Sequence, residues 1–340
     1  MAAGPEHQTD EPPGVPTLSA ARTKRARSAR SAWGQLLRLP NLLTAPGDPI
    51  AGYLLAGAGA QAGVGEITWR IIPAACASLL LYATGLVQND LADRRLDARQ
   101  RPDRPIPSGA VSVLSASAVA YILGVTGLAA AYLSFTDATF WLAVILAALI
   151  TLYNRASSRV SVAGPVNMGL CRGVSLLLGA SAAGDWQAAL SPTVLIAAGM
   201  IAIYIAAVTA IADRETATSR IGLIRWAPAA VLLVGCVAII SVQPALVASL
   251  WPIRSIHPLV WLAGALAIIT GWSVLCGRRL AGVCGPDRVG KTIGMFVRGL
   301  LPIQAALAVI SGDEAGRWAA AGLLSAWPMA GLLARRFPSS

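Results

Sequence analysis

The chain has 340 residues, of which 56% are hydrophobic and only 13% are charged, and its mean hydropathy is +0.63. An ordinary soluble domain is about 25% charged, so this composition excludes one and indicates a polytopic membrane protein. The formal net charge is +11, but no basic patch interleaved with aromatic residues accompanies it. Anionic lipid and an anionic substrate explain the charge better, and we expect no nucleic-acid partner.

Cysteine and histidine usage narrows the chemistry further. None of the five cysteines stands in a C-x-x-C or Cys/His spacing, so no disulfide or zinc framework is predicted. The two histidines are His7 and His257. Nucleophilic catalysis by a Ser-His or Cys-His pair is therefore not expected, nor is a metal site built on histidine.

Residues 1–31 are rich in Pro, Gly, Ala, Arg and Ser and contain no apolar run. Such a segment cannot bury a core, so we predict a disordered basic tail. It is not followed by the apolar region and cleavage site of a signal peptide. We interpret it as a cytoplasmic tail that touches anionic headgroups through Arg22, Lys24, Arg25, Arg27 and Arg30.

Residues 32–340 contain recurring apolar runs, each near the ~20 residues needed to cross a bilayer. They predict one integral membrane domain with an all-α fold, a polytopic helical bundle of about nine transmembrane helices, and leave a tenth crossing open. The runs cover about 40–60, 69–88, 110–133, 138–153, 161–183, 192–212, 224–243, 258–276, 292–311 and 316–334.

The distribution of basic residues orients the predicted bundle. Most arginines and lysines between the runs fall on the face of the N-terminal tail, whereas the opposite face carries Arg70, Arg254 and Arg317. This bias places the tail in the cytoplasm, so we predict a multi-pass protein of the inner (plasma) membrane. Arg335 and Arg336 join the cytoplasmic face if the last run crosses, which favours ten crossings.

The stretch from Gln88 to Asp97 ends an apolar run and is predicted to open a loop toward Gly109. Asp90, Asp93 and Asp97 are spaced i, i+3, i+7, so on a helix they share one face. Asn89 can add a carbonyl oxygen beside them. Oxygen ligands of this kind suit Mg²⁺, which bridges carboxylates to substrate phosphates. The alternative is a solvated loop whose acids are neutralised by Arg94, Arg95, Arg99 and Arg101.

A second acidic loop, Ala210 to Gly222, also follows an apolar run. Its symmetric placement allows Asp213 and Glu215 to face the first motif across a cavity and hold a second Mg²⁺ on one diphosphate. The metals and arginines would then stabilise charge that builds on departing pyrophosphate. The alternative is a local ion pair with Arg214 or Arg220.

Arg172 is predicted to lie inside a membrane helix, together with Asn167. A buried arginine costs about 2.5–3.5 kcal/mol or more at the bilayer centre unless it is paired or faces a polar cavity. Its planar guanidinium suits phosphate oxygens, so a phosphate clamp is one interpretation. The other is an arginine that snorkels from near a helix end.

The motif Asn-Asp-x-x-Asp-x-x-x-Asp from Asn89 to Asp97, followed by Arg-Pro-Ile-Pro-Ser-Gly from Arg104, resembles the first motif of the UbiA superfamily of intramembrane prenyltransferases. The segments Arg38–Asp48 and Asn167–Gly179 look closest to its EboC-like branch. The second family motif has two aspartates four residues apart. Here Asp213 matches the first, but Ala217 stands in place of the second, which removes one expected metal ligand.

The resemblance implies a helical prenyltransferase fold of nine crossings with a lateral opening to lipid. It implies Mg²⁺-dependent transfer of a prenyl group from an isoprenoid diphosphate to an aromatic or other small acceptor, in secondary metabolism or quinone-like biosynthesis. A terpene cyclase on the same scaffold and a non-catalytic binder or transporter of a lipophilic metabolite remain open.

The residues proposed for this chemistry fall into three groups. The metal ligands are Asn89, Asp90, Asp93, Asp97, Asp213 and Glu215. The diphosphate contacts are Asn41, Arg104, Arg155, Arg159 and Arg220. The residues proposed as catalytic are Asp93, Asp213 and Arg172. The sequence gives no prenyl chain length, acceptor or oligomeric state.

Overall fold

The computed structural model describes residues 31–57, 64–156, 160, 162–214, 218–242, 258–311 and 314–336. The predicted tail therefore lies outside the described residues except for Ser31. Two of the proposed site residues, Arg159 and Glu215, also lie outside them, as does Ala217.

The described chain is an all-α bundle, as the apolar runs predict. Its first half contains α2 (Leu39–Leu42), α3 (Gly47–Gly57), α4 (Val64–Gln100), α5 (Val113–Tyr132), α6 (Asp137–Arg155) and α7 (Ala163–Ala189). Its second half contains α8 (Pro192–Ala212), the 3₁₀ helix η2 (Gly222–Trp226), α9 (Ala227–Val242), α11 (Pro258–Arg279), α12 (Pro286–Arg298), α13 (Leu300–Val309) and α14 (Glu314–Arg336).

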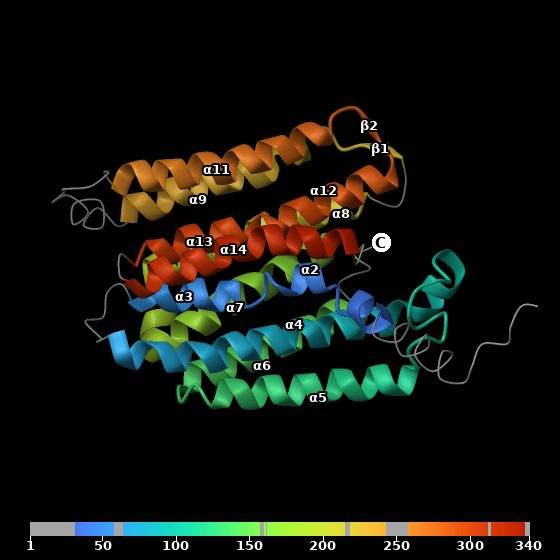
Figure 1. Cartoon of the computed structure of the whole chain (residues 1–340), viewed down its shortest axis with the longest axis horizontal. Coiled ribbons are helices and arrows are strands. Elements are labelled where there is room, and N and C mark those ends of the chain that lie inside the picture. The colour runs from blue at the N-terminus through green and yellow to red at the C-terminus, as the bar shows by residue number, and fades with distance from the viewer. Residues whose placement is uncertain are drawn as a thin grey trace, which may run out of the picture.

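The long helices lie side by side with similar axes, which gives the bundle a width of several helices and a thickness near one helix length (Figure 1). Helices α3 and α7 lie in the middle, α5 forms one edge, and α9 and α11 form the other. At one end, β1 (Ser219–Arg220) pairs with β2 (Val283–Cys284) in an antiparallel ribbon, with Ser219 opposite Cys284. This ribbon ties the loop after α8 to the loop before α12.

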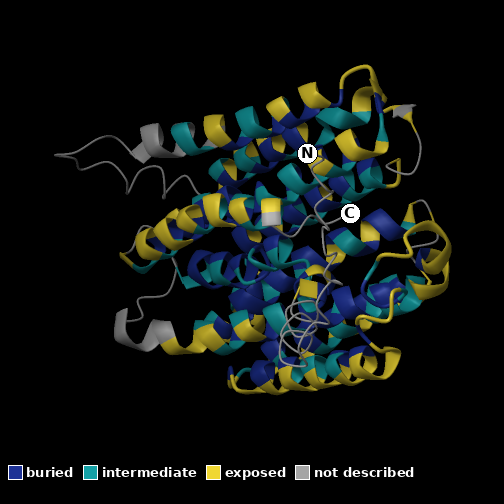
Figure 2. Ribbon diagram, turned by 45° about the vertical axis from the view of Figure 1, so that its right-hand side comes forward, coloured by how far each residue is buried: buried dark blue, intermediate teal, exposed yellow. Residues whose placement is uncertain are grey.

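Seven helices in the described residues are long and apolar enough to cross a membrane. This supports the predicted multi-pass membrane protein, although the predicted number of about nine crossings is not reached by this criterion. The peripheral helix α5 carries exposed apolar side chains, among them Leu114 and Tyr121 at 81% and 73% exposure. Exposed residues lie on the outer helices and buried ones between them, as expected where lipid covers the outside (Figure 2).

Helix α4 differs from the prediction, which ended the helix near Gln88 and opened a loop there. The helix continues to Gln100 and spans 37 residues. At 1.5 Å per residue it is about 55 Å long, against about 30 Å for a hydrocarbon core. Its last turns are stabilised because Asp90 and Asp97, buried on one face, form ion pairs with arginines from outside the helix.

The central helices α3 and α7 make a very close backbone contact. A Cβ atom on Gly52 would overlap the carbonyl oxygen of Leu176, and one on Gly179 would overlap the backbone of Pro49. Small residues allow such an approach between membrane helices. The contact fixes the start of α3 beside the middle of α7, where the buried polar residues of both helices lie.

Candidate functional site

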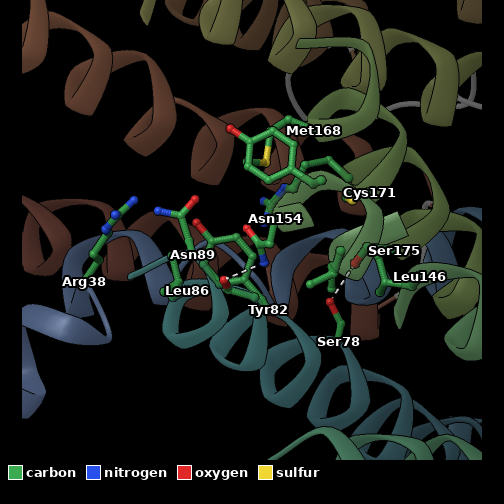
Figure 3. A pocket seen from close by; sticks show the side chains of 14 residues that line it. Arg38, Ser78, Tyr82, Leu86, Asn89, Leu146, Asn154, Met168, Cys171 and Ser175 are labelled. Atoms are coloured by element: carbon green, nitrogen blue, oxygen red, sulfur yellow. Dashed lines mark hydrogen bonds between the residues drawn. The ribbon is translucent and has the colours of Figure 1, made fainter. Parts of the chain in front are cut away.

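A cavity of about 130 Å³ lies between α4, α6 and α7. Figure 3 shows Arg38 and Asn89 at one end of it, which we call the mouth, and Ser78 and Ser175 at the other, which we call the inner end. Apolar side chains also line the cavity, with Leu86 from α4 and with Leu146 and Ile150 from α6. The site therefore joins a charged end to a buried polar end.

Two acids of the predicted metal motif are engaged by arginines beside the mouth. An Arg38 Nη2 donates to Asp90 Oδ1 at 3.1 Å, and Arg104 Nη1 donates to Asp97 Oδ2 at 2.8 Å. The same Arg104 nitrogen lies 3.9 Å from Asp90 Oδ1. Arginines therefore neutralise the carboxylates of Asp90 and Asp97, as the alternative interpretation of the motif predicts. The arginines are Arg38 and Arg104, however, and not Arg94 and its neighbours.

Asn89 and Asp93 form a different pair at the same level of α4. The side-chain amide of Asn89 donates to Asp93 Oδ2 at 3.3 Å, and Asn89 lines the cavity. The Oδ1 atom of Asn89 and the carboxylate of Asp93 then remain as oxygen donors. No ion pair with an arginine forms at Asp93 in the described part of the chain.

Asp213 caps the C-terminus of α8. Tyr153, a cavity residue, lies within electrostatic range of both Asp93 and Asp213, so the two acids from separate halves of the sequence lie at the same end of the bundle. Desolvation by burial raises the pKa of the Asp213 carboxyl above its ordinary value.

This donor set fits Mg²⁺ through its chemistry. Among the described residues, no three His, Cys, Asp or Glu side chains come together to hold a metal by themselves. Mg²⁺ does not require that, because it commonly binds one or two carboxylates and takes its other ligands from water and substrate phosphates. Asn89 and Asp93, with Asp213 at the same end of the bundle, supply that number of protein oxygens.

The interior beside the cavity holds a second polar system, which we call the interior network. Arg172 Nε lies 2.7 Å from Asp48 Oδ2, and both side chains are almost fully buried. An Arg172 Nη2 donates to the Thr44 carbonyl at 2.9 Å, and Gln304 Nε2 donates to the same carbonyl at 2.9 Å and to Asp48 Oδ1 at 2.6 Å. Arg172 also stacks over the Tyr82 ring at 5.6 Å.

The interior network bears on the two interpretations of Arg172. Its guanidinium is 5% exposed, lies in the middle of α7 and lines the cavity, so it does not snorkel to a helix end. Its charge is already balanced by Asp48. The role as a phosphate clamp therefore stays a prediction with a competing anion beside it.

The predicted diphosphate contacts are spread over the same end of the molecule. Asn41 lies in α2, Arg155 is exposed at the end of α6, and Arg220 is exposed in β1. Arg104 is the ion-pair partner of Asp97 described above. None of these four residues lines the cavity, and their assignment as diphosphate contacts remains a prediction.

Several residues of the site were absent from the sequence prediction. In the sequence prediction, Arg38 and Asp48 appear only as the bounds of a segment that resembles the family, and Gln304 does not appear. A signal for the interior pair was present, because Asp48 and Arg172 are opposite charges inside two different apolar runs. Charges in membrane helices usually pair with one another or face a polar cavity.

Comparison with known proteins agrees with this architecture. The model of the UbiA prenyltransferase family matches residues 50–281. The chain belongs to the UbiA prenyltransferase family. Digeranylgeranylglyceryl phosphate synthase of Methanoculleus marisnigri is 33% identical over 154 residues, which are 45% of this chain and 52% of that protein. The chain thus spans about half the length of the curated relatives that it matches.

Solved structures share the fold at low sequence identity. A structure described as digeranylgeranylglyceryl phosphate synthase in membranes has a TM-score of 0.56 and 18% identity, over 85% of this chain and 99% of that one. A UbiA homologue from Archaeoglobus fulgidus bound to GPP and Mg²⁺ has a TM-score of 0.51 and 17% identity, over 83% of this chain and 100% of that one. The EboC-like branch stays a prediction.

Proposed function

We propose that this member of the UbiA family is an intramembrane prenyltransferase that moves a prenyl group from an isoprenoid diphosphate to a small acceptor, with Mg²⁺ as cofactor. The observation that carries the proposal is the pair Asn89 and Asp93 at the mouth of a cavity in a membrane bundle, with Asp213 from the other half of the chain in the same region. The homologue bound to GPP and Mg²⁺ supports the substrate class and the metal.

In this proposal the diphosphate binds at the mouth and the isoprenoid chain lies against apolar cavity walls. Asn89, Asp93 and Asp213 would hold Mg²⁺, which when bound neutralises charge on the departing pyrophosphate. Arg38 lines the cavity, so its guanidinium can donate to diphosphate oxygens once the substrate competes with Asp90. Asp90 and Asp97 then serve to orient Arg38 and Arg104.

The cavity walls suit a cation-like prenyl fragment. The rings of Tyr82 and Tyr153 line the cavity, and an aromatic face within about 6 Å attracts a positive charge. Leu86, Leu146 and Ile150 exclude water from the space between mouth and inner end. Exclusion of water favours attack by the acceptor over hydrolysis.

The proposed orientation follows the sequence: the mouth faces the cytoplasm and the protein lies in the plasma membrane. In Figure 1 the end of α8, the β1–β2 ribbon and the C-terminal end of α14 lie at the same end of the bundle. Arg335, near the C-terminal end of α14, is thus on the side of the acidic motifs, in agreement with the positive-inside bias.

The test is Mg²⁺-dependent release of pyrophosphate from GPP by the full chain in nanodiscs, with and without a panel of aromatic acceptors. Asp93→Ala should abolish the release because the main carboxylate for the ion is gone. Asp103→Ala is the matched control, since Asp103 is an exposed acid outside the motif, in the loop after α4. Full turnover by Asp93→Ala would overturn the metal assignment.

A further inference from the structure

The inner end of the cavity holds hydrogen-bonding groups that the chemistry at the mouth does not use. Ser78 and Ser175 are 2% and 3% exposed, and Arg172 is 5% exposed, yet all three line the cavity. Ser78 precedes Asn89 by about three turns of α4, so this end lies well inside the membrane. Each of these groups has a partner within the protein, but a hydroxyl oxygen and a guanidinium that line a cavity can take a further hydrogen bond from a ligand there.

The direction of the hydrogen bonds at the serine pair can be deduced. Ser78 donates its single hydroxyl hydrogen to the carbonyl of Ala45 at 3.2 Å. Because that hydrogen is directed to Ala45, we assign Ser175 as the donor in the contact of 2.6 Å between the two hydroxyl oxygens. With its hydrogen used, the oxygen of Ser175 can only accept from a ligand.

Arg172 supplies the complementary donor. Its Nε faces Asp48 and its Nη2 is bonded to Thr44. Within the described part of the chain, its Nη1 has no hydrogen-bond partner. Arg172 and Ser175 are three residues apart on α7, so their side chains lie on the same face of the helix. The inner end therefore presents one donor and one acceptor next to each other.

The charge at this end is balanced before any ligand arrives. Asp48 lies 2.7 Å from Arg172 Nε in a fully buried position. An anionic ligand would add a second negative charge beside one guanidinium, in surroundings with little solvent screening. A carboxylate or phosphate is also acceptor-only, so it could not donate to the oxygen of Ser175.

A hydroxyl group matches this pattern, because it donates one hydrogen bond and accepts others. We propose that the inner end of the cavity binds the hydroxyl group of an uncharged acceptor, such as a phenol or an alcohol, and selects against acceptors that carry a carboxylate or phosphate there. That the bound molecule is an acceptor substrate rests on the proposed prenyl transfer. The binding preference itself requires neither Mg²⁺ nor turnover.

Photolabelling with two matched probes tests the preference directly. The probes are 4-hydroxybenzophenone, which is neutral, and 4-benzoylbenzoate, which is anionic and of similar shape. The full chain in nanodiscs of neutral lipid is irradiated without Mg²⁺, and labelled peptides are mapped by mass spectrometry. We expect the neutral probe to label the inner-end segment around Cys171 and Ser175, which line the cavity, at least about tenfold more than the anionic probe, equivalent to about 1.4 kcal/mol.

Two variants distinguish the proposed contacts from general partitioning into the bilayer. Ser175→Ala removes the acceptor and should lower labelling by the neutral probe about fivefold or more. Ser181→Ala is the matched control, because Ser181 is a buried serine of the same helix that does not line the cavity and whose hydroxyl lies 2.8 Å from that of Thr139. Labelling of this variant should be unchanged. Equal loss in both variants would overturn the assignment of Ser175.

Asp48→Asn provides a reversal of the preference if that variant folds. Without the carboxylate, Arg172 keeps an uncompensated charge, so labelling by the anionic probe should rise to at least that of the neutral probe. In the wild-type chain, equal or stronger labelling by the anionic probe, or no labelling of the inner end by either, would overturn the inference. The proposed function has its own readout in pyrophosphate release, so either can fail without the other.

Discussion

At the mouth of the cavity, Asp90 and Asp97 meet Arg38 and Arg104, whose side chains are 28% and 15% exposed. At the inner end, the side chains of Asp48 and Arg172 are 0% and 6% exposed. Water and substrate can compete for the pairs at the mouth, whereas the pair of Asp48 and Arg172 is almost fully buried and is held together inside the interior network. The comparison teaches that ion pairs of the same residue types can exchange partners where they are partly exposed and hold a fixed geometry where they are buried.

The largest expected effect comes from breaking the inner pair on one side. Asp48→Leu leaves Arg172 with a buried, uncompensated charge, so we expect the free energy of unfolding to fall by about 3–5 kcal/mol. Equilibrium unfolding in mixed detergent and SDS measures it. The double variant Asp48→Leu with Arg172→Leu should recover most of the loss, because no charge is left unpaired. A double variant as unstable as the single one would contradict the description of the pair as self-contained.

A smaller effect is expected at Gln304, which joins the interior network from α13. Gln304→Leu removes the hydrogen bonds to Asp48 and to the carbonyl of Thr44. Thr44 retains its bond from Arg172, so the expected loss is about 1–3 kcal/mol, below that of Asp48→Leu. The same unfolding assay checks the order of the two variants. A loss at Gln304 that exceeds the loss at Asp48 would reverse the assigned importance of the two partners.

The smallest effect on stability is expected at the mouth. Arg38→Ala removes a partly exposed ion pair, and Asp90 keeps Arg104 at 3.9 Å, so the free energy of unfolding should change by about 0.2–1 kcal/mol. High salt should reduce this difference further. Arg94→Ala serves as control, because Arg94 is exposed and donates to the Leu91 carbonyl one turn back on the same helix. A change of several kcal/mol at Arg38 would remove the contrast between mouth and inner end.

Much of the fold could be predicted because each apolar run of sufficient length indicates a helix from local sequence alone. The all-α class follows from apolar runs near the length that crosses a bilayer, and the placement of Arg172 inside a helix was also correct. The predicted end of α4 was wrong because a charged stretch favours a loop when the partners of its charges are unknown. Arg38 lies 52 residues before Asp90, and no local pattern signals that contact. Asp48 was missed for the same reason, since its partner lies in another helix.

The candidate site was less predictable than the fold. Asn89 of the acidic motif lines the cavity and is bonded to Asp93, and the role of the motif in metal binding stays a prediction. The serines of the inner end could not be found, because Ser78 and Ser175 look like any small residues in membrane helices. The proposed role of these serines depends on the direction of their hydrogen bonds and on which groups line the cavity, and both follow only from three-dimensional contacts.

Helix α4 carries both Asn89 at the mouth and Ser78 at the inner end on one continuous rod. Eleven residues at 1.5 Å each separate the two positions by about 16 Å. A packed helix, unlike a loop, cannot change its length to suit a ligand, so the distance between the two ends of the cavity is fixed. Under the proposed function, prenyl donor and acceptor share that length, so a longer acceptor leaves less of it for the prenyl chain.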